Sequence, residues 1–342
     1  MNNYIVSEIY KSDKKSIDQV DKLLHKESIK RDKNSDYLAA IFDDDGKVIA
    51  TGSLYKNTLR SLAVDGDRQG ESLMNTLISH LIYEANSRGY SKLYLYAKAS
   101  SSHIFKTLGF SEIARVDGVL SFMENEKDGF VKYLNSLNKN EKSYKKVAGL
   151  IINANPFTKG HLYLVEKASK ENDLVHLFIV SDDSSVFPYK VRKDLVMKST
   201  KYLDNIIYQE TGDYLISTST FPSYFIKNEP DVIRAQAKLD GSIFIQIAKE
   251  LGINKRYLGT EIPGSTTHIY NQILIDLLPK NGIEIELVDR IKNEGENISA
   301  SKVRELIKND KIEDTKPLLS DSTYNFIRSE NAKPIIEKIK DQ

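Results

Sequence analysis

The chain has no cysteine and no tryptophan among its 342 residues. Without cysteine it forms no disulfide, so it is not a small secreted scaffold held together by such bonds. The same absence excludes a thiolate zinc site and an iron–sulfur cluster. The chain also has no nucleophilic thiol of its own. Any thiol chemistry must therefore use a thiol that a substrate or partner supplies.

An excess of charge and a long apolar segment are missing as well. Lysine and arginine number 49 and aspartate and glutamate 48, which gives a net charge of +1. We expect no nucleic-acid partner and no membrane partner, because no strong overall field would attract either. The longest clean apolar run, Val147–Ile152, is far below the ~20 residues of a membrane span. The first residues lack an apolar signal segment, so we expect a cytoplasmic protein.

The length predicts two domains, at roughly 150 residues each. Hydrophobic residues make up 40% of the chain, which is enough for two cores. A polar stretch rich in lysine and asparagine runs over residues 126–146. We therefore predict a first domain over residues 1–128, a linker over 129–145 and a second domain over 146–342.

The first domain alternates strand-like and helix-like segments, which is an α+β pattern. Apolar segments at 37–42 and 47–55 flank an Asp-Asp-Asp-Gly turn, which predicts a hairpin. Apolar residues recur at helical spacing over 73–87, and Gly89 follows as a stop signal. We predict further strands at 60–64 and 92–97 and a helix at 101–108.

From residue 146 the pattern changes to strands that alternate with helices. Such alternation predicts a mostly parallel sheet with crossover helices, a Rossmann-like α/β domain. Ligands of such sheets bind at the carboxyl ends of the strands, where the strand order reverses. The predicted strands are 147–153, 174–181, 206–209, 256–260 and 283–289, and the predicted helices are 161–170, 190–203, 243–251, 267–278 and 299–309.

The first candidate site follows the first strand of this second domain. That strand runs into Asn-Ala-Asn-Pro-Phe-Thr-Lys-Gly-His, and a predicted helix follows at once. A helix start at this place presents unpaired backbone N–H groups and a partial positive charge, so it binds anions. Gly160 lets the backbone approach a phosphate, and Thr158 and His161 lie on the same side. A simpler interpretation makes Thr158 a helix cap and leaves His161 without a role.

The second candidate site is Ile-Ser-Ala-Ser-Lys-Val-Arg at residues 298–304, which opens another predicted helix. Ser299 is placed to cap this helix, and Ser301 and Arg304 project from its first turns. Hydroxyl groups, backbone N–H groups and a guanidinium near one helix start suit a triphosphate. The alternative is a plain capped helix with a surface arginine.

The basic residues Lys190 and Arg192 start the helix after the second strand of this domain. They are candidate ligands of β- and γ-phosphates, and a solvated basic helix start is the alternative. The histidines outside the first site show no metal-ligand spacing. We therefore expect no metal site formed by the protein itself.

The two sites resemble the (His/Thr)-x-Gly-His and Ile-Ser-x-(Ser/Thr)-x-(Ile/Val)-Arg motifs of the nucleotidyltransferase α/β phosphodiesterase superfamily. The resemblance implies that ATP binds here and that His161, Thr158 and Arg304 are catalytic. It implies an α-phosphate contact by Gly160 as well. The other ATP-binding residues that it implies are Asn153, Asn155, Pro156 and Phe157 around the nucleotide, with Lys190, Arg192, Ser299 and Ser301 at the β- and γ-phosphates.

Three further stretches narrow the resemblance. They are Leu-Gly-Thr-Glu at 258–261, Thr-Thr-His-Ile-Tyr-Asn at 266–271 and Ala-Lys-Leu-Asp-Gly-Ser-Ile-Phe at 237–244. With the first site they are similar to the citrate (pro-3S)-lyase ligase family, also called acetate:citrate-lyase ligases. In that family Gly259, Thr260 and Glu261 would face the adenine or the ribose.

The resemblance implies a reaction. ATP and acetate, with Mg²⁺, would acetylate a thiol on the CoA-like prosthetic group of the citrate lyase acyl-carrier (gamma) subunit, through acetyl-adenylate. AMP and pyrophosphate would leave. The absence of cysteine agrees with a thiol on the partner.

The first domain resembles the GNAT acetyltransferase fold. Leu-Ala-Val at 62–64 precedes Arg-Gln-Gly-Glu-Ser-Leu-Met at 68–74, a long helix and Phe-Lys-Thr-Leu-Gly-Phe at 105–110. In that family a Gln/Arg-x-x-Gly-x-Gly/Ala loop wraps the pyrophosphate of acetyl-CoA. If Gln69 is the first residue of this loop, the two small positions fall on Ser72 and Met74, and Met74 would crowd the backbone. Acetyl transfer, recognition of the prosthetic arm or of a lyase subunit, and a structural role all stay open.

Two other functions compete with the ligase. One is a small-molecule adenylyltransferase of the phosphopantetheine or nicotinate mononucleotide type, which would share both phosphate motifs. The 258–261 and 266–271 stretches and the additional first domain disfavour it. The other is an acetyl-CoA-dependent acetyltransferase with a nucleotide-sensing module, which the altered loop at 70–74 disfavours. A non-catalytic binding protein fits two intact phosphate motifs least well.

Overall fold

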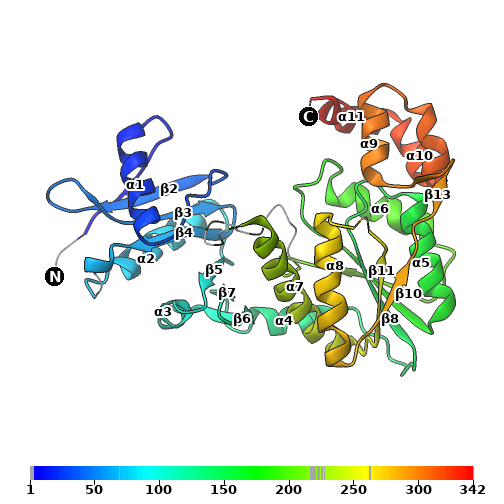
Figure 1. The fold of residues 1–342 in the computed structure, drawn as a ribbon, viewed down its shortest axis with the longest axis horizontal. Coiled ribbons are helices and arrows are strands. Elements are labelled where there is room, and N and C mark those ends of the chain that lie inside the picture. The colour runs from blue at the N-terminus through cyan, green and yellow to red at the C-terminus, as the bar shows by residue number, and fades with distance from the viewer. Residues whose placement is uncertain are drawn as a thin grey trace. The chain divides into compact units, whose positions relative to one another are not determined.

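The computed structural model describes residues 4–68, 70–215, 221, 224, 226, 228–261 and 263–341, so Gln69 lies outside the described residues. The chain divides into two compact units (Figure 1). The first unit comprises Met1–Val131 and Phe221–Leu239, and the second comprises Lys132–Thr220 and Asp240–Gln342. The sequence-based division into 1–128, 129–145 and 146–342 stays a prediction. It did not anticipate that the segment Phe221–Leu239 groups with the first unit.

Within the described residues, the first unit is built on a seven-stranded sheet in the order β1-β2-β3-β4-β5-β7-β6. Its strands are β1 (Val6–Glu8), β2 (Tyr37–Phe42), β3 (Val48–Tyr55), β4 (Thr58–Val64), β5 (Tyr94–Lys98), β6 (Ser111–Val116) and β7 (Leu120–Glu124), and its helices are α1 (Lys14–Lys26), α2 (Leu73–Ser87) and α3 (Ser102–Thr107). The predicted hairpin is confirmed, because β2 and β3 pair antiparallel.

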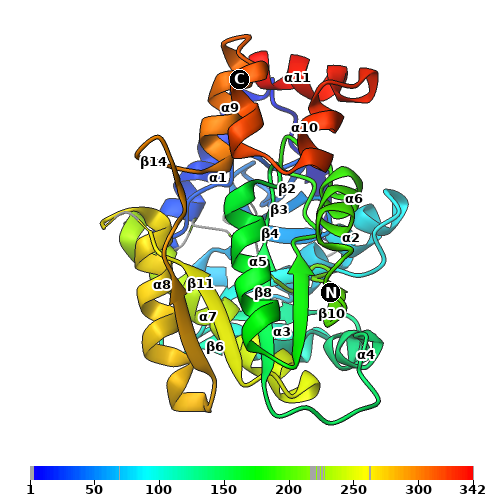
Figure 2. The same cartoon turned by 90° about the vertical axis from the view of Figure 1, so that its right-hand side faces the viewer.

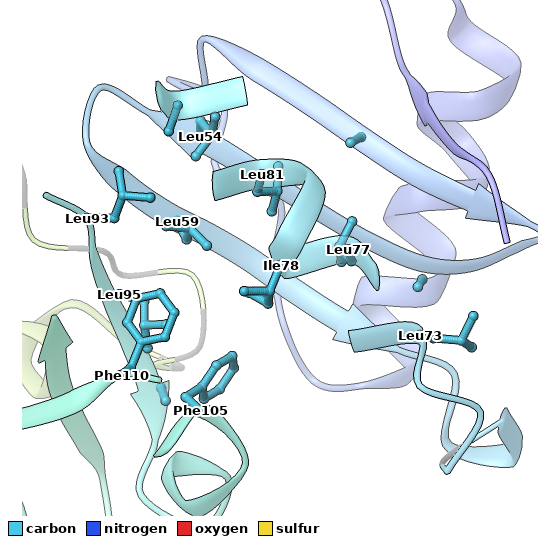
Figure 3. Packing of buried hydrophobic residues seen from close by; sticks show 14 of the residues in the cluster. Leu54, Leu59, Leu73, Leu77, Ile78, Leu81, Leu93, Leu95, Phe105 and Phe110 are labelled. Carbon is cyan, nitrogen blue, oxygen red and sulfur yellow. The ribbon is translucent and has the colours of Figure 1, made fainter. Parts of the chain in front are cut away.

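Helices cover both faces of this sheet, which explains why the sequence of β2 is apolar throughout. Tyr37, Ala39 and Ile41 pack with α2, whose leucines point at the sheet (Figure 3). Leu38 and Ala40 point the other way and pack with α1. Alternate residues of a strand face opposite sides, so a strand that is buried on both faces is apolar at every position.

In the second unit, the described residues form a five-stranded parallel sheet in the order β10-β9-β8-β11-β12. This confirms the predicted parallel sheet and the α/β class. The strands are β8 (Val147–Ile152), β9 (Leu174–Ile179), β10 (Ile206–Glu210), β11 (Lys255–Gly259) and β12 (Glu284–Val288), with a short ribbon of β13 (Lys292–Asn293) and β14 (Glu296–Asn297). The order reverses between β8 and β11, so the expected ligand-binding edge lies at their carboxyl ends.

Helices lie on both faces of this second sheet as well. Helices α5 and α6 pack together on one face, in front of the sheet in Figure 2. On the other face Phe244 of α7 approaches Gly149 of β8 closely. The helices are α5 (Lys159–Glu171), α6 (Tyr189–Thr200), α8 (Thr266–Leu277), α9 (Ala300–Lys308), α10 (Asp321–Ile327) and α11 (Lys333–Lys340), while α4 (Gly129–Ser136) and α7 (Glu229–Leu251) have residues in both units.

The helix predicted over 243–251 is wrong in its start, because α7 begins at Glu229. The helix contains Gly241, although glycine weakens a helix interior by about 1 kcal/mol relative to alanine. Here it serves packing instead. A Cβ at Gly241 would lie 2.6 Å from Leu277 Cδ2 of α8, so the missing side chain lets the two helices approach.

His176 in β9 gives the second unit a pH-dependent stability. Its ring is buried, the side-chain amide of Gln209 donates to Nδ1 at 3.0 Å, and burial lowers its pKa to about 4. In the unfolded chain a histidine has a pKa of about 6.5. Between these values the unfolded state binds the extra proton and the folded state does not, so stability falls as the pH falls from about 6.5 to about 4.

We expect this histidine to remove about 2 kcal/mol of unfolding free energy between pH 7 and pH 4.5. Urea unfolding at both pH values, in the wild type and in His176→Gln, measures the contribution. Glutamine does not titrate, so the variant should lose less stability over this interval than the wild type. An equal loss in both proteins would show that His176 is not the source.

Candidate functional site

The site forms where β8 ends and α5 begins. The loop after Ile152 runs through Asn153 and Ala154 to a cis peptide between Asn155 and Pro156. The segment between β9 and α6 holds this loop in place. The Phe187 N–H donates to Asn155 Oδ1 at 3.0 Å, and Ser185 Oγ donates to Asn153 Oδ1 at 3.2 Å. The predicted pocket residues therefore lie in one loop, with Asn153 exposed and Pro156 buried.

Thr158 and His161 close the start of α5 reciprocally. The His161 N–H donates to Thr158 Oγ1 at 3.3 Å, and the Thr158 N–H donates to His161 Nδ1 at 3.1 Å. The imidazole also stacks on buried Phe157, with ring centroids 5.7 Å apart. Because Nδ1 accepts a backbone N–H, the neutral ring carries its proton on Nε2. Thr158 is thus the helix cap of the simpler interpretation, and the cap fixes the imidazole as an Nε2–H donor.

The imidazole is a donor without a charge. Burial, with a smaller contribution from the positive charge of Arg290, lowers the pKa of His161 to about 4. At neutral pH the ring is therefore uncharged. It can donate one hydrogen bond to an anion beside the first turn of α5, but it cannot neutralise the anion's charge.

The second motif packs against the first. A Cβ at Gly160 would lie 3.3 Å from the carbonyl oxygen of Ile298, so glycine permits this close approach. Ser299 caps α9, because the Lys302 N–H donates to Ser299 Oγ at 3.1 Å. Arg304 donates to the carbonyl oxygen of Asn155 and to Ser301 Oγ.

Arg304 is tied to the loop as well as to its own helix. Burial lowers the pKa of its guanidinium. Its hydrogen bond to the Asn155 carbonyl links the predicted triphosphate motif to the predicted nucleotide pocket. The structure therefore brings the two sequence motifs together at one edge of the sheet.

The two basic residues at the start of α6 lie in different surroundings. Lys190 is exposed. Arg192 is completely buried and donates to the backbone carbonyls of Phe187, Asn153, Val180 and Asp182. Since these carbonyls take its donors, Arg192 is placed to hold the loops after β8 and β9 rather than to bind a phosphate directly. Burial also lowers the pKa of its guanidinium.

The ends of β11 and β12 add a third set of polar groups. The Gly259 carbonyl accepts from Asn271 Nδ2 at 3.0 Å. Arg290 donates from Nε to the Thr260 carbonyl at 3.0 Å and from Nη2 to Glu261 at 2.5 Å. The sequence predicted Gly259, Thr260 and Glu261 here but missed Arg290. Its position just after a predicted parallel strand was the signal that could have found it.

The first unit contains a separate cavity of about 510 Å³. Strands β4 and β5 pair only near their starts, at Thr58–Tyr94 and Leu59–Leu95, and the cavity opens beyond this point. It is lined by residues 62–64 of β4, 96–98 of β5 and the start of α2. Ser72, which precedes α2 at φ 59°, makes no capping hydrogen bond through its side chain, and it lines the cavity together with the first turn of α2. The first N–H groups of a helix have no partner within the helix. Met74 lines the cavity and packs partly on the core.

Two features are absent from the described residues. Among their side chains, no group of three or more histidines, aspartates or glutamates is placed to hold a metal ion. Within the same ranges, no helix has both the length and the apolar character required to cross a membrane.

The second unit is thus an α/β domain with a candidate anion-binding site at the edge where the strand order of its parallel sheet reverses. Its defining features are the reversal of strand order between β8 and β11, the Thr-x-Gly-His helix start at that reversal, and the second motif packed against Gly160. Such an edge of a parallel sheet is where nucleotides bind.

Comparison with known proteins identifies the family. Residues 147–327 match the family "Citrate lyase ligase C-terminal domain", and residues 4–110 match the acetyltransferase (GNAT) family. The [Citrate [pro-3S]-lyase] ligase of Escherichia coli (strain K12) is 32% identical over 96% of this chain and 94% of its own length. The ligase of Klebsiella pneumoniae is 31% identical, over 92% and 93%. The chain belongs to the citrate lyase ligase family, as its motifs predicted.

Solved structures resemble parts of the chain. Thermotoga maritima TmcAL, bound with alpha-thio ATP, is 14% identical with a TM-score of 0.37, over 55% of this chain and 56% of that one. The family assignment rests on the sequence relatives, which span nearly the whole chain.

Proposed function

We propose that this protein is an ATP-dependent ligase that acetylates the thiol of the CoA-like prosthetic group on the acyl-carrier subunit of citrate lyase. Membership of the ligase family over nearly the whole chain supports the overall reaction. The single structural observation that carries the proposal is the uncharged Nε2–H of His161 at the start of α5. It provides an anion-binding donor where the parallel sheet places ligands.

In the first step an acetate oxygen attacks the α-phosphorus of ATP. A new oxygen–phosphorus bond forms, the bond to the β-phosphate oxygen breaks, and pyrophosphate leaves with that bond's electrons. The product is acetyl-adenylate. The protein contributes position and electrostatic stabilisation in such a transfer, and little covalent chemistry.

The side chains divide this work. His161 Nε2–H and the first backbone N–H groups of α5 donate to the α-phosphate, and Thr158 keeps the imidazole in the required tautomer. Lys190 and Ser301, which are exposed, bind the β- and γ-phosphates. Arg192 and Arg304 support these contacts by holding the loop at 153–157.

In the second step the carrier thiol, as thiolate, attacks the acetyl carbon. The thioester bond forms, the bond from that carbon to the phosphate oxygen breaks, and AMP leaves. The chain has no cysteine, so the acceptor is the partner's thiol. The overall balance is acetate, ATP and carrier thiol giving acetyl-carrier, AMP and pyrophosphate.

Mg²⁺ accompanies ATP in this proposal. The described residues offer no group of three or more metal-ligating side chains, so phosphate oxygens and water would supply most of its ligands. When bound, it would offset negative charge on the triphosphate. The protein's own share of that task lies with its basic side chains.

The cavity of the first unit fits the prosthetic arm. The cavity has apolar walls and lies between β4 and β5, which do not pair with each other beyond residue 59. The backbone groups of such unpaired strand edges can form hydrogen bonds with the amide groups of an extended arm. The start of α2 suits a phosphate of that arm. We propose that this unit receives the arm, and that Met74 and Ser72 replace the small residues of an acetyl-transferring loop.

For this first-unit proposal we expect Ser72→Glu to weaken binding of dephospho-CoA to the full chain roughly 10-fold, because a carboxylate would repel the phosphate. Calorimetric titration measures the affinity. Acetate-dependent ATP–pyrophosphate exchange should stay at the wild-type rate, since it needs no carrier. Unchanged dephospho-CoA affinity in the variant would contradict the assignment.

The ligase function is tested by ATP–pyrophosphate exchange with labelled pyrophosphate and no partner protein. Exchange that depends on acetate supports acetyl-adenylate formation, and transfer to deacetylated citrate lyase completes the assignment. Exchange that depends instead on a phosphorylated vitamin precursor would favour the small-molecule adenylyltransferase. Absence of exchange even with deacetylated citrate lyase present would overturn the proposal.

A further inference from the structure

Arg290 is a cation held in a fixed position at the edge that carries the site. It follows β12, and its backbone N–H lies 3.4 Å from Thr260 Oγ1. Its side chain donates to the Thr260 carbonyl and to Glu261, both at the end of β11. Two contacts of the guanidinium and one of the backbone with the neighbouring strand's end hold this arginine more firmly than a surface arginine.

The chain brings this residue against the Thr-x-Gly-His turn. The next residue, Ile291, accepts a hydrogen bond from the Ile298 N–H at 3.1 Å. The carbonyl of Ile298 in turn packs on Gly160, immediately before His161. The positive charge of Arg290 accordingly acts on the imidazole and contributes to its lowered pKa.

The guanidinium has capacity for a ligand. Its Nε and Nη2 groups are engaged, whereas Nη1 has no hydrogen-bond partner among the described residues. The side chain is 30% exposed and that of Glu261 16% exposed, so the pair is accessible from the site edge. Glu261 orients the guanidinium by binding Nη2 and leaves the N–H groups of Nη1 available to a ligand.

The site needs a cation here. His161 is uncharged and Arg192 is fully occupied by backbone carbonyls. An anionic nucleophile that approaches an anionic phosphate meets repulsion, which a nearby positive charge reduces.

We infer that Arg290 is the side chain that neutralises the α-phosphate of the bound nucleotide, through Nη1, beside the uncharged donor of His161. In this division the histidine supplies a directed hydrogen bond and the arginine supplies the charge. Glu261 is a positioning residue that acts through Arg290. The inference rests on the proposed function for its nucleotide, but it concerns nucleotide binding and not acetate.

The test compares a nucleotide with its nucleoside, which differ only in the α-phosphate. Calorimetric titration of the full chain with AMP and with adenosine, in the wild type and in Arg290→Met, separates phosphate contact from base and ribose contact. We expect AMP binding to weaken roughly 10- to 100-fold and adenosine binding to change less than about twofold. Arg290→Lys should retain part of the AMP affinity, because it keeps a point charge.

Arg328→Met is the matched control. This residue also pairs with a glutamate, Glu313, at 3.1 Å, but it lies beyond α10, outside the residues assigned to the site. The AMP affinity of this variant should equal that of the wild type. Equal weakening of AMP and adenosine in Arg290→Met would place Arg290 at the base or ribose and overturn the inference. So would unchanged AMP binding together with a raised KM for acetate.

The result is independent of the ligase assignment. If the wild type shows no acetate-dependent exchange yet its AMP affinity depends on Arg290, the proposed function fails and this inference stands. If acetate-dependent exchange is normal and the AMP affinity does not depend on Arg290, only this inference fails.

Discussion

Replacement of His161 by alanine is expected to lower acetate-dependent ATP–pyrophosphate exchange by roughly 10²-fold or more, without unfolding the second unit. Loss of one donor aimed at developing charge typically raises a barrier by about 3–4 kcal/mol. Here the lost donor is Nε2–H, which the bond from the Thr158 N–H to Nδ1 fixes in place. Steady-state exchange rates at saturating ATP and acetate, beside thermal unfolding curves, measure both parts of the expectation.

Two further variants separate catalysis from helix capping. His161→Glu keeps an acceptor for the Thr158 N–H, as in an ordinary capping box, but has no donor and adds a negative charge. We expect near-normal stability and an even slower exchange. His268→Ala removes a histidine from the same third position of α8, where its N–H donates to capping Ser265 at 3.1 Å, and exchange should stay normal. Near-normal turnover of His161→Ala would reject the catalytic role.

The centre of the site could be predicted because its information is local. A buried strand, a turn and a capped helix start are written in consecutive residues, and Gly160 marks a close approach that the Ile298 carbonyl makes. The second motif has the same local character around Ser299. Both motifs follow from helix-start chemistry, which needs no knowledge of the rest of the fold.

The residues that sequence reasoning missed or misplaced depend on long-range geometry. Arg290 is significant because β12 ends beside β11, more than a hundred residues from His161 in the sequence, and the sequence signals it only by its position just after a predicted strand. Helix α1 has its apolar residues at helical spacing but is otherwise highly charged, and it was not predicted. Strands β6 and β7 likewise went unassigned, because they are ordered by long-range pairing that their sequence does not show: β7 pairs with β5, and β6 pairs with β7.

Arg192 is another residue whose role depends on long-range geometry, and its substitution is expected to have a large effect on stability. A basic pair at a helix start predicts two phosphate ligands, yet only Lys190 is exposed. The sequence does not say which way each side chain points. In the fold, Arg192 fills a fully buried space and donates to four carbonyls that end or follow β8 and β9. Removing a buried donor leaves its acceptors unpaired, which is costlier than losing the bond itself.

We expect Arg192→Met to lower the unfolding free energy by about 3–5 kcal/mol, because four backbone carbonyls lose the donor of a buried side chain at once. Urea unfolding followed by circular dichroism measures the loss. Lys193→Met is the neighbouring control, since the ion pair of Lys193 with Glu210 at 2.6 Å is exposed, and such pairs contribute about 0–1 kcal/mol.

The informative variant is Arg192→Lys, which keeps the charge but not the planar set of donors. A direct phosphate ligand would tolerate this change with little loss of stability and a modest rise in the KM for ATP. If Arg192 instead supports the loops, the protein should not tolerate this change. One ammonium group with three donors cannot reach the carbonyl of Asn153 and the carbonyl of Asp182 together. We expect a clear loss of stability in Arg192→Lys, with ATP affinity reduced in proportion as the loop loses its order. A stable Arg192→Lys protein with selectively weakened ATP binding would return Arg192 to the triphosphate site.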